Sequence, residues 1–198
     1  MMAEDKTINE IAKCFSGTIK DSKILKCILK QLNFKAEKEI TYSNNVVIEE
    51  LIDSKAGVYA FEITNKGNLL AQAEVSELKN LWDCRKNENV PRANKLSTNQ
   101  WLYVGRDFTD INNRIKAHLG QGSKSTYALK LGAINKENEQ EQENKEKYSS
   151  LENLLSTRTI TCYRFTISEE MDDIIRAGYI AMIEGILHEK LKPILGKK

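Results

Sequence analysis

Apolar and polar positions alternate with different periods along this chain, and the changes in period divide it into elements. In the first fifty residues the apolar positions recur at helical spacing, which predicts two short helices, over 8–15 and 21–32. Beyond them the sequence becomes rich in β-branched and aromatic residues, as is typical of strands. The predicted strands cover 46–48, 57–63, 101–104 and 159–167.

Helical spacing returns after the second of these strands. Further helices are predicted over 72–83, 110–119 and 169–191. Asp110 stands where its carboxylate can cap the second of them, and Pro193 stops the third. Strands and helices in this order predict a small α+β fold in which a few strands are covered by helices.

The size and composition suit one ordinary folded domain. A chain of 198 residues with 40% hydrophobic and 29% charged residues is long enough to bury one core. No stretch approaches the ~20 consecutive apolar residues of a membrane span, so no membrane partner is expected. No apolar segment typical of a secretory signal is found near the first methionine. The four cysteines lack CxxC spacing, which favours reduced thiols and a cytoplasmic location over a zinc site.

Charge is distributed unevenly, although the formal net charge is only +2. Residues 6–38 hold eight lysines against three acidic residues, and residues 92–130 hold seven lysines and arginines against two, so each segment carries +5. Such segments are either solvated helix faces or contacts for an anionic partner. Residues 136–147 hold five glutamates and three lysines with no apolar residue, which predicts a solvated, mobile insertion.

The last predicted helix carries an acidic residue on its apolar face. From 177 to 187 the only charged residue is Glu184, and Ile180, Leu187 and Leu191 share its face. A carboxylate in such surroundings costs roughly several kcal/mol unless a cation or a hydrogen-bond network compensates it. Two interpretations are open at this point: an internal ion pair with an arginine or lysine, and a metal ligand.

Four other residues gain meaning only when they are taken together. Arg114 and His118 lie one turn apart on the predicted helix 110–119, where such a pair is ordinarily part of the surface. Tyr59 and Tyr103 lie in two different predicted strands, each two residues away from a glycine. Strand tyrosines are ordinarily core aromatics, so neither of them indicates a function by itself.

The order of these residues along the chain resembles the GIY-YIG endonuclease family. The two tripeptides of the family stand here as GVY at 57–59 and YVG at 103–105, with valine in place of isoleucine. Arg114, His118 and Glu184 then follow in the family's order. The two motif tyrosines are 103 − 59 = 44 residues apart, which implies an insertion between their strands.

The resemblance extends over most of the chain and implies its organisation. It implies a small three-stranded central sheet flanked by helices, in a nuclease domain over 51–198 with insertions at about 65–99 and 135–148. Residues 1–50 are then a helical N-terminal extension. One departure concerns Gly196, which stands where the family often has an asparagine about a dozen residues after the glutamate.

The resemblance also implies a chemistry, the metal-dependent hydrolysis of DNA phosphodiester bonds. It implies Glu184 as the ligand of Mg²⁺ or Mn²⁺, whose charge opposes the charge that develops on the phosphate. Arg114 offers a planar fork of donors to the phosphate oxygens. A motif tyrosine is implied as the base that activates water, with Tyr59 preferred, while Tyr103 and His118 orient the water or share the proton. The assignment among these three residues stays open.

DNA is the implied partner, and the basic segment 92–130 supplies candidates for contacts with its backbone. These candidates are Arg92, Lys95, Arg106, Lys116, Lys124 and Lys130. Two alternatives from other classes stay open: a nucleic-acid-binding module of the same fold without cleavage, and a protein-interaction domain in which Glu184 and Arg114 pair with each other. The sequence defines neither the oligomeric state nor the preferred nucleic-acid site.

Overall fold

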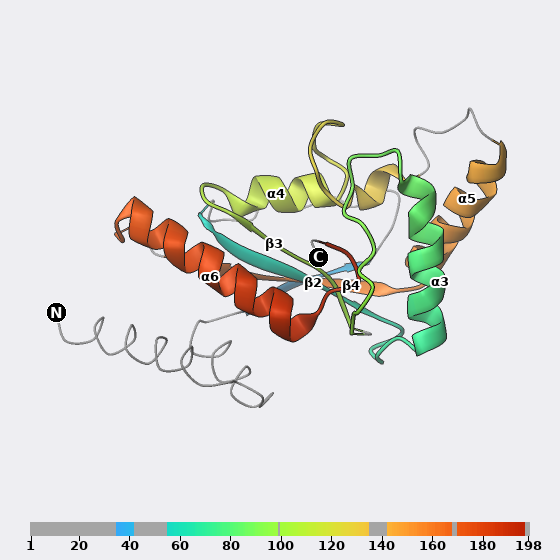
Figure 1. Cartoon of the computed structure of the whole chain (residues 1–198), viewed down its shortest axis with the longest axis horizontal. Helices are drawn as coiled ribbons and strands as arrows, with labels where there is room; N and C mark the ends of the chain where they lie inside the picture. The colour runs from blue at the N-terminus through green and yellow to red at the C-terminus, as the bar shows by residue number, and fades with distance from the viewer. Residues whose placement is uncertain (1–34, 42–54, 99, 135–141, 168–169, 197–198) are drawn as a thin grey trace. The chain divides into compact units, whose positions relative to one another are not determined.

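The structure, a computed structural model, describes five stretches of the chain (Figure 1). These are residues 35–41, 55–98, 100–134, 142–167 and 170–196. They belong to one compact unit that begins at Lys35. The helices predicted over 8–15 and 21–32 and the strand predicted over 46–48 lie outside the described residues.

The centre of the fold is an antiparallel sheet of four strands in the spatial order β1-β4-β2-β3. The strands are β1 (Lys35–Thr41), β2 (Gly57–Thr64), β3 (Trp101–Asp107) and β4 (Thr159–Thr166). The α+β class is thereby confirmed. The three strands predicted over 57–63, 101–104 and 159–167 are the neighbours β2, β3 and β4, and the strand with the GVY tripeptide lies between the other two.

The fourth strand corrects the predicted boundary of the N-terminal extension. Residues 35–41, which the sequence analysis assigned to a helical extension over 1–50, form β1 and pair antiparallel with β4, with an irregularity between Ala36 and Lys38. This segment, KAEKEIT, has four charged residues in seven and so lacks the apolar signal of a strand. Charged residues are typical of edge strands, whose outer side has no neighbour.

Four helices accompany the sheet among the described residues. They are α3 (Gln72–Trp82), α4 (Ile111–His118), α5 (Gln142–Ser156) and α6 (Asp173–Leu191). The predicted cap of α4 is present, because the Asp110 carboxylate accepts hydrogen bonds from the main-chain N–H groups of Asn112 and Asn113 at 2.8 and 3.4 Å. None of the helices in these residues is long and apolar enough to cross a membrane.

Helix α5 was not predicted from the sequence, which indicated a solvated, mobile insertion over 136–147. The helix begins inside the acidic tract, and its Tyr148, Leu151 and Leu155 are buried in the core beside α3. The charged residues 145–147 are exposed, as predicted. Glutamate, glutamine and lysine favour helices, so a polar tract can form the first turns of a helix that is anchored by apolar residues further on.

The alternation of side chains along β2 and β3 decides which residues meet. Tyr59 lies opposite Gly105 and Phe61 lies opposite Tyr103, so these four positions share one face of the sheet. Arg106 points to the other face. Figure 1 shows the strands passing between α4 on one side and α6 on the other. The two helices that carry the remaining motif residues therefore approach the same pair of strands from opposite sides.

The chain that follows α6 runs back along the edge of β3. The N–H groups of Ile194 and Leu195 donate to the carbonyl oxygens of Trp101 and Leu102 at 2.8 and 2.9 Å. The Gly196 N–H donates to the Arg92 carbonyl oxygen at 2.9 Å. These main-chain bonds fix the end of the chain beside the strand that carries the YVG tripeptide.

Candidate active site

Gly105 makes the close approach of the two motif tyrosines possible. A Cβ atom at this position would lie 2.5 Å from the Tyr59 Oη and 2.8 Å from the Tyr103 Cε1, which is closer than real Cβ atoms come to any neighbour. With glycine there, the rings of Tyr59 and Tyr103 stack with their centroids 6.4 Å apart. The glycine of the YVG tripeptide thus has a steric function in this fold.

His118 contacts both tyrosines from the last turn of α4. Its Nε2 lies 2.8 Å from the Tyr59 Oη, and its ring centroid is 4.6 Å from that of Tyr103. The Leu129 main-chain N–H donates to Nδ1 at 3.0 Å. Since Nδ1 accepts a hydrogen bond, the proton of the neutral imidazole is on Nε2, and His118 donates to the Tyr59 phenol.

The electrostatics of His118 agree with this neutral tautomer. The side chain is completely buried, and this burial, with a smaller contribution from the Arg114 charge, lowers the pKa of His118 to about 3. The imidazole is therefore uncharged at neutral pH. It is a hydrogen-bond donor toward Tyr59 and a poor base, because its other nitrogen is already occupied by the Leu129 N–H.

Arg114 adds a cation to the same cluster from the preceding turn of α4. It lies close enough to the Tyr59 phenol to lower its pKa, and its Nη2 donates to the Tyr127 carbonyl oxygen at 3.0 Å. Its Nε lies 4.0 Å from the Asp107 Oδ2, at the end of β3. The guanidinium is about a quarter exposed, so it links the buried phenols to the surface.

The two phenols stay protonated at neutral pH in these surroundings. Burial raises the pKa of Tyr59 well above its ordinary value, and the Tyr103 ring adds to this, while the Arg114 charge and hydrogen bond oppose it without cancelling it. Burial likewise raises the pKa of Tyr103, with Tyr127 and Glu184 adding to the effect. Desolvation is therefore the dominant influence on both tyrosines.

Glu184 lies at the edge of this cluster and has its own ion pair. Its Oε2 is 2.8 Å from Arg106 Nη1, and its Oε1 is 4.0 Å from His188 Nε2, one turn along α6. The sequence analysis left open a pair between Glu184 and Arg114, and this pairing is wrong. Arg106 and Arg114 point to opposite faces of the sheet, and the helix with Glu184 covers the face of Arg106.

The Glu184 carboxylate is not sealed in hydrocarbon. About a fifth of its side chain is exposed, and its charge is close enough to raise the pKa of Tyr103. Gly196 lies nearby as well, since a Cβ built on it would be 3.4 Å from His188 and 3.8 Å from the Tyr103 ring. The position where the family often has an asparagine thus faces the candidate site.

The predicted nucleic-acid contacts fall into two groups. Lys95 and Lys124 are exposed, and Lys116, which lies in α4, is half-buried. The others are engaged within the protein: Arg92 donates to the main-chain oxygens of 85 and 86, and Arg106 holds Glu184. Lys130 is buried, and its amine donates to the Lys124 carbonyl oxygen.

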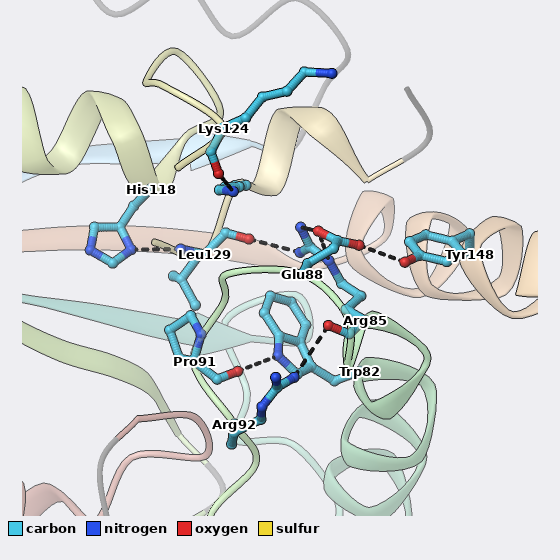
Figure 2. Close-up of polar contacts among 10 residues, drawn as sticks. Trp82, Arg85, Glu88, Pro91, Arg92, His118, Lys124, Leu129 and Tyr148 are labelled. Carbon is cyan, nitrogen blue, oxygen red and sulfur yellow. Dashed lines mark hydrogen bonds and ion pairs between the residues drawn. The ribbon is translucent and has the colours of Figure 1, made fainter. Parts of the chain in front are cut away.

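Three residues of the site region were missed by the sequence analysis. Asp107 orients Arg114 and caps the turn after β3, and Tyr127 brings both its carbonyl and its ring to the cluster. Asp107 could have been found, because it follows the YVG tripeptide closely. Arg85 could not: it is fully buried, yet it comes from the insertion between the motif strands, where no pattern marks it (Figure 2).

The described part of the chain contains no group of three or more histidine, cysteine, aspartate or glutamate side chains that could hold a metal ion. Glu184 offers a single carboxylate, with one oxygen held by Arg106 and the other toward His188. This donor fits an Mg²⁺ ion that keeps most of its waters and takes further oxygen ligands from a substrate phosphate. It does not fit a metal bound by protein groups alone.

Comparisons of the chain with protein families, with curated proteins and with solved structures found no match. The resemblance to GIY-YIG nucleases therefore stays a prediction from the motif residues.

Proposed function

We propose that this chain is a cytoplasmic, metal-dependent endonuclease of GIY-YIG type that hydrolyses DNA phosphodiester bonds. The observation that supports this best is the cluster of Tyr59, Tyr103, Arg114 and His118, which come from two strands and a helix and lie in mutual contact. A histidine that donates to a phenol, with an arginine charge beside it, favours the phenolate, as a site that uses a tyrosine as a base requires.

Tyr59 is the residue best placed to be the general base. The His118 Nε2–H donates to its Oη at 2.8 Å, and the nearby Arg114 guanidinium lowers its pKa, so both groups favour the charged phenolate. Tyr103 is the weaker candidate, because burial raises its pKa, Tyr127 and Glu184 add to this effect, and no histidine donates to its phenol oxygen among the described contacts. His118 cannot take the proton at Nε2, which already carries one, so its part is to orient and polarise Tyr59.

Arg114 is the residue that connects substrate binding with this base. It is partly exposed and shares its donors among the Tyr59 phenol, the Tyr127 carbonyl and the region of Asp107. Tyr59 itself is fully buried. The partly exposed guanidinium can bind a phosphate oxygen through its fork of donors while its charge continues to favour the Tyr59 phenolate.

Glu184 would hold the divalent cation, which supplies positive charge against the phosphate and the leaving oxygen. In the structure Arg106 neutralises this carboxylate. Arg106 is itself partly exposed, so it becomes available to a second phosphate of the DNA backbone when Glu184 is engaged otherwise.

Plasmid nicking in the presence of Mg²⁺ or Mn²⁺ tests the proposal. We expect conversion of supercoiled into nicked plasmid that depends on the metal and falls by roughly a hundredfold or more in Tyr59→Phe, Arg114→Gln and Glu184→Gln. Lys79→Gln, a change on the remote helix α3, is the control with unchanged activity. Absence of cleavage with each divalent ion in a folded wild-type protein would refute the enzyme.

A second candidate is a nucleic-acid-binding module of the same fold that does not cleave. The ion pair between Arg106 and Glu184 favours it, because a carboxylate with a permanent cation needs no metal. This candidate predicts salt-dependent binding of labelled DNA, without cleavage, that is unaffected by EDTA and by Glu184→Gln. Lack of any salt-dependent DNA binding would leave the protein-interaction alternative.

A further inference from the structure

We propose that Arg85, a residue of the insertion between the motif strands, is a positioning residue for the Tyr59–His118 pair and acts through the main chain of Leu129. The expected effect of Arg85 on catalysis rests on the proposed function. The contacts that carry it are independent of that function, and they link four segments of the chain (Figure 2).

The Arg85 side chain is buried and is held in one position by several contacts at once. Its side chain is completely buried, directly after α3, and its guanidinium carbon lies 4.7 Å above the Trp82 ring. Its Nε and Nη2 donate to the Glu88 Oε2 at 3.0 and 2.6 Å. These contacts satisfy one edge of the guanidinium and leave Nη1 directed away from Glu88.

Nη1 donates to the Leu129 carbonyl oxygen at 2.7 Å, in a buried environment. The N–H of the same residue is the group that donates to His118 Nδ1. Figure 2 shows Leu129 between the two side chains, with His118 on one side and Arg85 on the other. Leu129 is thus held at both of its main-chain polar groups, and one of these bonds determines the protonation pattern of His118.

The insertion supports this segment at a second point and is itself supported by α5. The Ala128 N–H donates to the Asn89 carbonyl oxygen at 3.4 Å, one residue before Leu129. Tyr148 of α5 donates to the Glu88 Oε1 at 2.5 Å, so the carboxylate that holds Arg85 is anchored in turn. The insertion at about 65–99 and the insertion at about 135–148 are therefore in contact with each other, and together they hold the main chain next to Leu129 in place.

The consequence for Tyr59 follows from the two tautomers of a neutral histidine. With Leu129 in place, Nδ1 is the acceptor and Nε2–H donates to the Tyr59 phenol. If Leu129 moves away, Nδ1 can carry the proton instead, and Nε2 becomes an acceptor. The Tyr59 phenol then donates a hydrogen bond to the His118 Nε2. It thereby loses one of the two contacts that favour its phenolate.

The ¹⁵N spectrum of the imidazole rings measures this arrangement in the full-length protein without any substrate. The chain has only two histidines, so His188→Gln assigns the signals of His118. We expect a protonated Nε2, an unprotonated Nδ1 and a through-hydrogen-bond coupling between Nδ1 and the Leu129 amide nitrogen in the wild type. A protonated Nδ1 in the wild type would overturn the proposal before any further variant is made.

Arg85→Met then tests the role of the guanidinium. We expect a shift of His118 toward the other tautomer, loss of the coupling to Leu129, and a kcat for plasmid nicking that falls roughly tenfold to a hundredfold with little change in KM. Arg85→Lys, which retains one donor and the charge, should recover part of both effects. If Arg85→Met does not fold, Arg85→Lys decides, with a smaller shift in the same direction supporting the proposal.

The matched control is Arg158→Met. Arg158 forms a comparable, largely buried ion pair, with Glu74 at 2.6 Å, near α3 and α5, but it has no contact with Leu129. It should lower thermal stability and leave the His118 spectrum as in the wild type. A His118 spectrum and a kcat unchanged by folded Arg85 variants would refute the proposal. An altered spectrum in a protein that never cleaves DNA would support the positioning role and refute the nuclease.

Discussion

A single added methyl group should disrupt the candidate site, in the variant Gly105→Ala. The new Cβ would lie 2.5 Å from the Tyr59 Oη, 2.7 Å from its Cζ and 2.8 Å from the Tyr103 Cε1. Tyr59 has no room to retreat, because Phe61 and His118 pack against its ring with centroids 5.9 and 5.3 Å away. The tyrosine must therefore leave the position from which it bonds to His118.

The expected loss of stability has two parts. Overpacking of a dense core by one methyl group costs about 1–3 kcal/mol. A buried hydrogen bond that breaks and leaves its partner unsatisfied costs about 1–3 kcal/mol more. We therefore expect the free energy of unfolding of Gly105→Ala to be lower by about 2–6 kcal/mol, measured by urea denaturation at pH 7.

Gly178→Ala is the matched control for this measurement. Gly178 lies in α6, and a Cβ built there has nothing within 4 Å. This substitution should raise stability by about 0.5–1 kcal/mol, since alanine favours the helix. A Gly105→Ala protein as stable as the wild type, with its nicking activity intact, would show that Tyr59 is free to move and that the geometry inferred for the phenol cluster is incorrect.

Three further predictions concern ionisable groups. Because the pKa of His118 is lowered to about 3, the unfolded chain binds a proton there that the folded protein does not, so stability should fall as the pH drops from about 6.5 toward 3, by at most about 5 kcal/mol, and less in His118→Gln. Burial raises the pKa of Cys84 to about 11, so its alkylation at pH 8, followed by mass spectrometry, should be roughly a hundredfold slower than in the urea-unfolded chain. Arg106→Gln should change stability by only about 1 kcal/mol or less, because its pair with Glu184 is partly exposed, and it should lower the Mg²⁺ concentration needed for half-maximal nicking. A higher requirement for Mg²⁺ in this variant would contradict a ligand role for the carboxylate.

Strands β2, β3 and β4 and helices α3, α4 and α6 were predictable because each carries a local signal, whereas α5 was not predicted. Tyr59 and its neighbours alternate with β-branched residues, and α4 begins at an aspartate whose cap the structure contains. The edge strand β1 was not predictable in the same way. Its residues are mostly charged, and what makes it a strand is the unpaired edge of β4 beside it, which is a property of the assembled sheet.

The same distinction applies to the candidate site. In the structure Tyr59, Tyr103, Arg114 and His118 lie close together, as the order of the motifs led us to expect, and their catalytic role stays a prediction. The ion partner of Glu184 could not be read from the chain. Several arginines were available to it, and the choice depends on which face of the sheet α6 covers.

The role of Arg85 is harder still to predict from the sequence. A buried arginine in an insertion resembles any solvated arginine until its acceptors are known, and here one acceptor is a main-chain carbonyl 44 residues away. Such a contact has no side-chain partner to leave a pattern. Positioning roles that pass through the main chain are therefore the part of a site that sequence motifs reveal least.

The electrostatics of the phenol cluster connect the charges of Arg114, Arg106 and Glu184 with the protonation of the two tyrosines. Burial alone holds the phenol of Tyr59 in its neutral form, and the charge of Arg114 only partly offsets it. A reaction that needs the phenolate must therefore add positive charge next to the tyrosines, at the one place where Glu184 approaches Tyr103. Until a substrate arrives, Arg106 neutralises that carboxylate. The ion pair that favours a binding module is thus also compatible with an enzyme that has a single carboxylate ligand, and metal-dependent nicking, together with the Mg²⁺ requirement of Arg106→Gln, separates the two.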